Sequence, residues 1–72
     1  DGNGVPMNKQ EAVKWYRKAA DLGHDDAMWN LGRCYEKGEG VEKNIDQAVY
    51  WYKKGAAKNK YSCKEALKRL GY

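Results

Sequence analysis

This sequence of 72 residues suffices for one small domain, near the lower size limit at which a hydrophobic core offsets the entropy of ordering the chain. Two distant cysteines exclude a cysteine-rich metal site, and no apolar run approaches the roughly 20 residues of a membrane-spanning helix. The net charge of +4 is concentrated at one end, because residues 53–72 carry seven lysines and arginines against Glu65 alone. Such a segment can attract nucleic acid or an acidic partner, although a solvated helix face is the favoured interpretation.

The first predicted helix covers residues 9–22. Its apolar residues recur at the spacing of an amphipathic helix, and they are Ala12, Trp15, Tyr16, Ala19 and Ala20. Asn8, followed three residues later by Glu11, is an N-terminal capping signal, and Gly23 can take the left-handed conformation that ends a helix. We expect Trp15 and Tyr16 to lie in the core.

The second predicted helix covers residues 25–37. Asp25 or Asp26 opens it as the N-cap, and Gly38 ends it. The small residues Ala27 and Gly32 lie on its apolar face, where they allow a neighbouring helix to come close.

The third predicted helix covers residues 45–58 and repeats the first. After a loop at residues 38–44, Asn44 and Gln47 restate the capping signal, and Trp51 and Tyr52 restate the aromatic pair. A shift of 36 residues aligns ten identical residues between segments 2–20 and 38–56. A repeat of this length indicates a solenoid, in which each unit buries its apolar face against a neighbour.

The fourth predicted helix covers residues 63–71, with Ser62 as its N-cap. Its residues Ala66 and Leu70 match Ala27 and Leu31 when the shift is increased to 39. This alignment predicts about three inserted residues between positions 58 and 63.

The order of residues in the central unit resembles a complete Sel1-like repeat. The residues that carry the resemblance are Ala27, Leu31, Gly32, Tyr35, Gly38, Gly40, Val41, Asn44, Ala48, Trp51 and Tyr52. The segment from Gly2 to Ala20 resembles the second half of another such repeat. The resemblance implies an all-α fold of antiparallel helix pairs stacked as a right-handed α/α solenoid, with the helix at 25–37 on its concave side. Within this single domain we expect residues 1–23 to be a half-repeat, 24–58 a complete repeat and 59–72 a terminal or capping helix.

No arrangement of residues predicts catalysis. His24 and Ser62 lack a supporting motif, and the Gly-x-Gly turns lack the strand and lysine of a phosphate-binding loop. We therefore expect no enzyme activity, no cofactor and no metal site. Cys34 and Cys63 are expected to lie too far apart for a disulfide and to be free thiols.

The predicted function is that of an adaptor, whose concave helix face binds a peptide or protein segment. Laying Ala66 over Ala27 places cations beside an aromatic ring, and the candidate binding residues are Trp29, Asn30, Arg33, Lys68 and Arg69. Trp29 can either pack between helices or form an exposed contact. The expected partner is a protein or peptide, an acidic one included, and neighbouring repeats or self-association are expected at the uncovered first helix. The alternative is a basic surface that binds nucleic acid or another anionic partner, and the sequence indicates no localisation.

Overall fold

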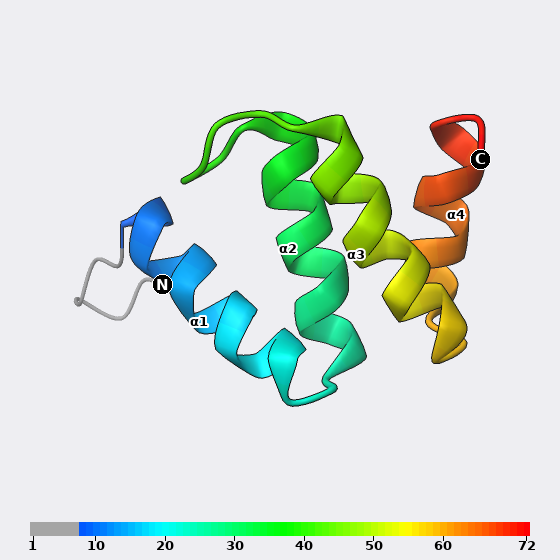
Figure 1. Ribbon diagram of the computed structural model, residues 1–72, viewed down its shortest axis with the longest axis horizontal. Helices are drawn as coiled ribbons and strands as arrows, with labels where there is room; N and C mark the ends of the chain where they lie inside the picture. Colours follow the sequence, from blue (N-terminus) through cyan, green and yellow to red (C-terminus); the bar gives the residue numbers. More distant parts are fainter. Residues whose placement is uncertain (1–7) are drawn as a thin grey trace.

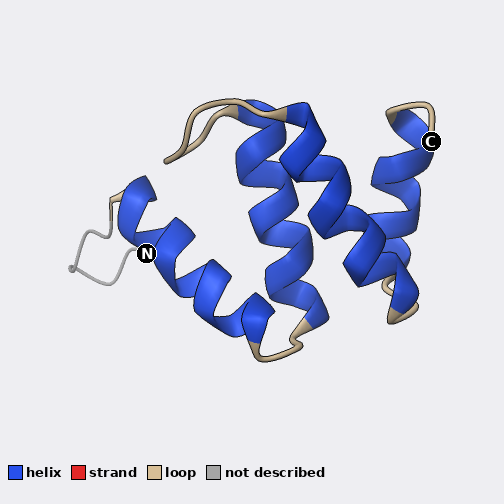
Figure 2. Ribbon diagram, viewed as in Figure 1, coloured by secondary structure: helices blue, strands red, loops and turns tan. Residues whose placement is uncertain are grey.

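The computed structural model describes residues 8–72, which form four α-helices and no strand. The helices are α1 (Lys9–Asp21), α2 (Asp25–Lys37), α3 (Ile45–Ala57) and α4 (Tyr61–Arg69). Each helix packs against the preceding one with its direction reversed, so that the four form a row in chain order (Figure 1). Turns and one longer loop at 38–44 join them (Figure 2). The predicted class of stacked antiparallel helix pairs is confirmed, whereas the first Gly-x-Gly turn lies outside the described residues.

Two of the four helices have the predicted side-chain caps. The side-chain oxygen of Asn8 accepts a hydrogen bond from the backbone N–H of Glu11 at 2.7 Å, and that of Asn44 accepts one from Gln47 at 3.1 Å. These bonds satisfy backbone donors that have no partner inside the helix. The capping pattern read from the sequence is therefore confirmed for α1 and α3.

The starts of α2 and α4 differ from the prediction. The N-cap residues are His24 and Lys60, and neither side chain makes a capping bond. Asp25 and Asp26 lie within the first turn of α2, where the helix dipole favours a negative charge without a cap. Ser62 likewise lies inside α4, which begins at Tyr61.

The chain keeps a constant period of 36 residues, so the predicted insertion between positions 58 and 63 is wrong. Gly23 and Asn59, which both have left-handed backbones with φ of 95° and 67°, stand 36 residues apart. The helices that follow, α2 and α4, also begin 36 residues apart. Arg69 therefore corresponds to Arg33 rather than to Asn30.

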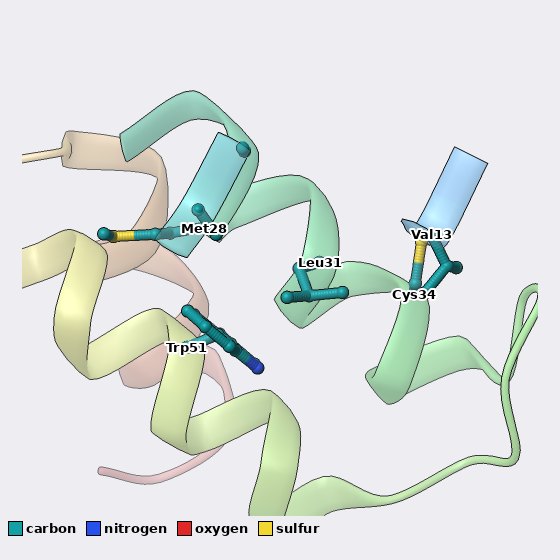
Figure 3. Packing of buried hydrophobic residues seen from close by; sticks show 7 residues of the cluster. Val13, Met28, Leu31, Cys34 and Trp51 are labelled. Atoms are coloured by element: carbon teal, nitrogen blue, oxygen red, sulfur yellow. The ribbon is translucent and has the colours of Figure 1, made fainter. Parts of the chain in front are cut away.

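The core consists of two clusters on opposite sides of the α2–α3 pair. The first joins α1, α2 and α3 through Val13, Ala20, Ala27, Met28, Leu31, Cys34 and Trp51 (Figure 3). The second joins α3 to α4 through Ala48, Tyr52, Cys63 and Ala66. Because both clusters include α3, the apolar face of each unit is buried by its neighbours, as expected of a solenoid.

Trp15 is not a core residue, contrary to the prediction. Its side chain is 61% exposed, whereas Trp51, at the same position of the repeat, is 6% exposed. The reason is that Trp51 faces α2, while no described helix covers the corresponding side of α1. The amphipathic pattern gives the apolar face of a helix, but it does not say whether a neighbour is present to cover that face.

Candidate binding groove between α2 and α4

A hollow of about 290 Å³ lies between the two helices that begin each repeat. Its lining residues are Trp29 from α2 and Tyr61, Ser62, Glu65, Ala66 and Arg69 from α4. Ala66 is buried in the second core cluster, whereas Tyr61 is 70% exposed at the rim. The hollow therefore has an apolar floor that rests on the core and a polar border open to solvent.

The wall formed by α2 is Trp29, and two further residues of the same helix, Asn30 and Arg33, are connected to it. Trp29 is half-buried against the second core cluster, and the guanidinium of Arg33 lies 4.9 Å from the centroid of its ring. The amide of Asn30 donates to the backbone oxygen of Asp26 at 3.0 Å and accepts from Arg33 at 3.3 Å. These contacts restrict the Trp29 ring and the Arg33 side chain, so that a ligand has less to order on binding.

Ion pairs tie α2 to α4 at both ends of the hollow. At one end, Arg69 donates two hydrogen bonds to the carboxylate of Glu36, at 2.6 and 3.1 Å. At the other end, the Lys60 ammonium binds Asp26. The Glu36 carboxylate is largely buried, whereas the Lys60–Asp26 pair is open to solvent and contributes little to stability.

The hydroxyl of Tyr52, on α3, also binds the Glu36 carboxylate that pairs with Arg69, because it donates a hydrogen bond to it at 2.7 Å. The hydrogen bonds from Arg69 lower the pKa of Glu36 below its usual range, and the bond from Tyr52 adds to this effect against the opposing effect of burial. Burial, followed by the hydrogen bond to Glu36 and then by its negative charge, raises the pKa of Tyr52. Glu36 is therefore ionised, and Tyr52 is protonated, at neutral pH.

The structure brings two of the five candidate residues, Trp29 and Arg69, into the hollow. Asn30 and Arg33 contact each other on α2, and Arg33 lines a separate hollow beside α1. Lys68 is exposed and is not among the lining residues. Four lining residues of α4 were not among the candidates from the sequence, and they are Tyr61, Ser62, Glu65 and Ala66. A constant 36-residue period would have found Glu65, because that period places it at the position of Trp29.

The groove carries charges of both signs rather than a uniform basic surface. Lys60 and Arg69 are neutralised by acidic partners on α2. Glu65 adds a negative charge at the rim, where it raises the pKa of the Tyr61 hydroxyl through a hydrogen bond. The ammonium of Lys54 lies over the rings of Tyr50 and Trp51, at 5.3 and 5.6 Å from their centroids. Several cations of the basic segment therefore have partners within the molecule, either a carboxylate or an aromatic ring.

Both cysteines are free and buried, which confirms the prediction. Burial raises the pKa of the Cys63 thiol to about 11, so that this residue carries almost no reactive thiolate at neutral pH. Within residues 8–72, no group of three or more histidine, cysteine or acidic side chains is placed to hold a metal ion. None of the helices in this part of the chain has the length and apolarity required to span a bilayer.

A sequence model of the Sel1 repeat matches residues 1–24 and 25–60. The chain belongs to the Sel1 repeat family. Sel1 repeats generally form scaffolds for protein–protein interactions, and the fold is in general not enzymatic. The resemblance seen in the sequence is thereby confirmed.

Two solved structures are similar to this Sel1 repeat chain. A Sel1 repeat protein from Oxalobacter formigenes is 43% identical, with a TM-score of 0.89 over 93% of this chain. A protective antigen of uropathogenic Escherichia coli strains, which displays an SLR fold, is 36% identical, with a TM-score of 0.87 over 92% of this chain. This chain spans only 28% and 14% of the length of those two chains. The comparison with curated proteins found no match.

Proposed function

We propose that this Sel1 repeat chain binds a segment of a partner protein in the groove between α2 and α4. The observation that carries the proposal is the hollow itself, which has the half-buried Trp29 as one wall and an opening to solvent. Tryptophan and arginine are the residues that most often dominate the free energy of binding at protein interfaces. Here Trp29 and Arg69 both line the groove.

The groove suits a segment with an apolar side chain next to an acidic group. An apolar side chain can lie over the floor formed by Ala66 and the ring of Trp29. Arg69 is the arginine that lines the groove, and its guanidinium has five N–H donors, of which two hydrogen bonds go to Glu36. The remaining donors can bind a carboxylate of the segment. The carboxylate can belong to an acidic residue or to a chain terminus.

A phage-displayed library of random peptides, selected on the full chain, provides the test. Selected peptides should lose most of their affinity for the Trp29→Ala variant and keep it for Tyr50→Ala, which removes an exposed ring that does not line the groove. Circular dichroism of both variants controls for folding. Peptides that bind Trp29→Ala as tightly as the unchanged protein would contradict the proposed site.

The alternative function, binding of nucleic acid through the basic end, has weaker support. Two of the cations in that segment are paired with Asp26 and Glu36, which reduces the field available to a polyanion. Adding heparin to the same peptide measurements separates the two functions. A heparin complex that is insensitive to Trp29→Ala, together with no selected peptide, would favour the alternative.

A further inference from the structure

The exposed aromatic rings of the molecule differ in whether a cation lies over them. Trp15, Tyr50 and Tyr72 each have a lysine ammonium between 5.3 and 5.6 Å from the ring centroid. Tyr61 is 70% exposed at the rim of the groove, and within residues 8–72 no lysine or arginine lies over its ring. Because the face of an aromatic ring is electronegative, it attracts cations. The Tyr61 ring can therefore accept a cation from a bound segment.

A carboxylate without a counter-ion stands beside this ring. Glu65 lines the same hollow, about one helical turn after Tyr61, and a hydrogen bond to it raises the pKa of the Tyr61 hydroxyl. The acidic residues at the two ends of the groove are paired with Lys60 and Arg69, whereas Glu65 forms no ion pair within the described chain. Lys68, three residues further along α4, does not line the hollow. The groove thus keeps one negative charge that no ion pair compensates.

The surface next to Glu65 is apolar. Trp29 and Ala66 line the hollow beside it, and Ala66 is buried in the second core cluster. Lysine and arginine lay their methylene stems along such a surface and keep the charged group at its polar edge. The Trp29 ring already has the guanidinium of Arg33 at 4.9 Å from its centroid, and Arg33 lines the other hollow rather than this one. A long basic side chain therefore fits the groove better than a short or purely apolar one.

The charged residues of α4 are spaced to match a short extended segment. Tyr61, Glu65 and Arg69 are four residues apart, so they form one row along the helix. The row spans about 12 Å, which is the length of about four residues in an extended chain. Arg69, at its far end, keeps N–H donors for an acidic group of the segment. The row therefore offers a negative and a positive group to one short stretch of chain.

We infer that the segment bound in the groove carries a lysine or arginine whose charge lies between the Tyr61 ring and the Glu65 carboxylate. The inference rests on the proposed function, because it names a further residue of the same bound segment. The stem of the basic side chain lies against Trp29 and Ala66. Its distance from the acidic residue at Arg69 is about two to four positions of an extended chain.

The test starts from a random-peptide phage library selected on the full chain, from which peptides that lose affinity for Trp29→Ala are kept. These peptides should share a lysine or arginine two to four positions from an acidic residue. One of them is then synthesised with a fluorescent label, and its basic residue is replaced by methionine, which is unbranched and uncharged. Fluorescence anisotropy should show binding that is about fivefold to tenfold weaker, since both the ring contact and the ion pair are lost. Glu65→Gln in the chain should weaken the unchanged peptide about twofold to fivefold and leave the methionine peptide unaffected.

Glu42→Gln is the matched control, because it removes an exposed negative charge from the loop at 38–44, outside the hollow. It should change the binding of neither peptide, and circular dichroism verifies that both variants are folded. Trp29-dependent peptides that share no basic residue, or equal effects of Glu65→Gln and Glu42→Gln, would overturn the basic residue and leave the proposed groove in place. A library that yields no Trp29-dependent peptide would overturn the proposed function and this inference with it.

Discussion

At the scale of single residues, the packing of α3 against α4 explains why Gly55 replaces the alanine found at the equivalent position, Ala19. A Cβ atom at Gly55 would overlap the sulfur of Cys63. In the first unit the corresponding pair is Ala19 of α1 and Ala27 of α2. Here the first helix has the larger residue, alanine instead of glycine, and the second helix has the smaller one, alanine instead of cysteine. The two pairs thus conserve volume, although glycine inside a helix costs about 1 kcal/mol relative to alanine.

This exchange predicts a coupled pair of substitutions. Gly55→Ala alone should lower the free energy of unfolding by about 1–3 kcal/mol, because it overpacks a buried contact. In a Cys63→Ala background the same substitution should be neutral or stabilising, since the pair then matches Ala19 and Ala27. Urea denaturation of the four proteins measures the coupling. Additive effects would show that the contact with Cys63 does not determine the glycine.

The Glu36 carboxylate, bound by Tyr52 and Arg69, predicts a specific dependence of stability on pH. Because the pKa of Glu36 is lowered in the folded state, its contribution is present above the unfolded pKa, ordinarily 4.5, and is lost as pH falls through the lower folded value. The Tm of Glu36→Gln should therefore fall less steeply than the Tm of the unchanged protein as pH falls from the unfolded pKa to the lower folded one. Parallel curves would contradict the assignment.

Removing only the hydroxyl that binds Glu36 has a separate expected effect. Tyr52→Phe keeps the buried ring but leaves Glu36 without one of its donors, and should cost about 1–2 kcal/mol of stability. Urea denaturation measures this change. Tyr35→Phe, which removes a hydroxyl bound only by the exposed Arg17, is the control and should cost less.

At the scale of elements, the helix starts fall into two kinds. Asn8 and Asn44 cap α1 and α3, whereas His24 and Lys60 leave the first turns of α2 and α4 without a side-chain acceptor. The N-cap residue Lys60 instead forms an ion pair with Asp26, which joins α4 to α2. At Lys60 the contact between helices therefore takes precedence over local capping.

This difference predicts that an added cap stabilises α2. His24→Ser should raise the free energy of unfolding by about 0.5–1 kcal/mol, because a serine hydroxyl can accept the unpaired backbone N–H groups of the first turn. Asn44→Ala should change it by about the same amount in the opposite direction. Thermal unfolding of the two variants checks both signs. A destabilising His24→Ser would show that the imidazole has a structural role.

At the scale of the whole molecule, the two tryptophans of the central repeat have different tasks. Trp51 is buried in the first core cluster, while Trp29 rests on the second cluster and lines the groove. Trp51→Ala should cost about 3–5 kcal/mol of stability and leave little folded protein, given the small core. Trp29→Ala should cost less stability and should weaken binding of a selected peptide by about 1–3 kcal/mol. Equal losses of stability in urea denaturation would place Trp29 in the core and remove the anchor of the groove.

The sequence by itself determined the class of fold. The 36-residue period and the helical spacing of apolar residues can both be read without knowing which helices lie side by side. It also determined the helices to within one or two residues and the caps at Asn8 and Asn44. Only the tertiary structure decided the register of α4. The match of Ala66 to Ala27 was a coincidence of residue types, whereas the left-handed Asn59 and the burial of Cys63 define the true correspondence.

The tertiary structure also decided the roles of equivalent residues. Trp15 and Trp51 are identical in the sequence pattern, and so are Tyr16 and Tyr52, yet one of each pair is buried and the other is not. The partnership of Arg69 with Glu36 joins residues 33 positions apart, and no local pattern encodes it. The physical reason is that propensity and periodicity act within one helix, whereas burial, ion pairing and the shape of a groove depend on which second and third helices lie beside it.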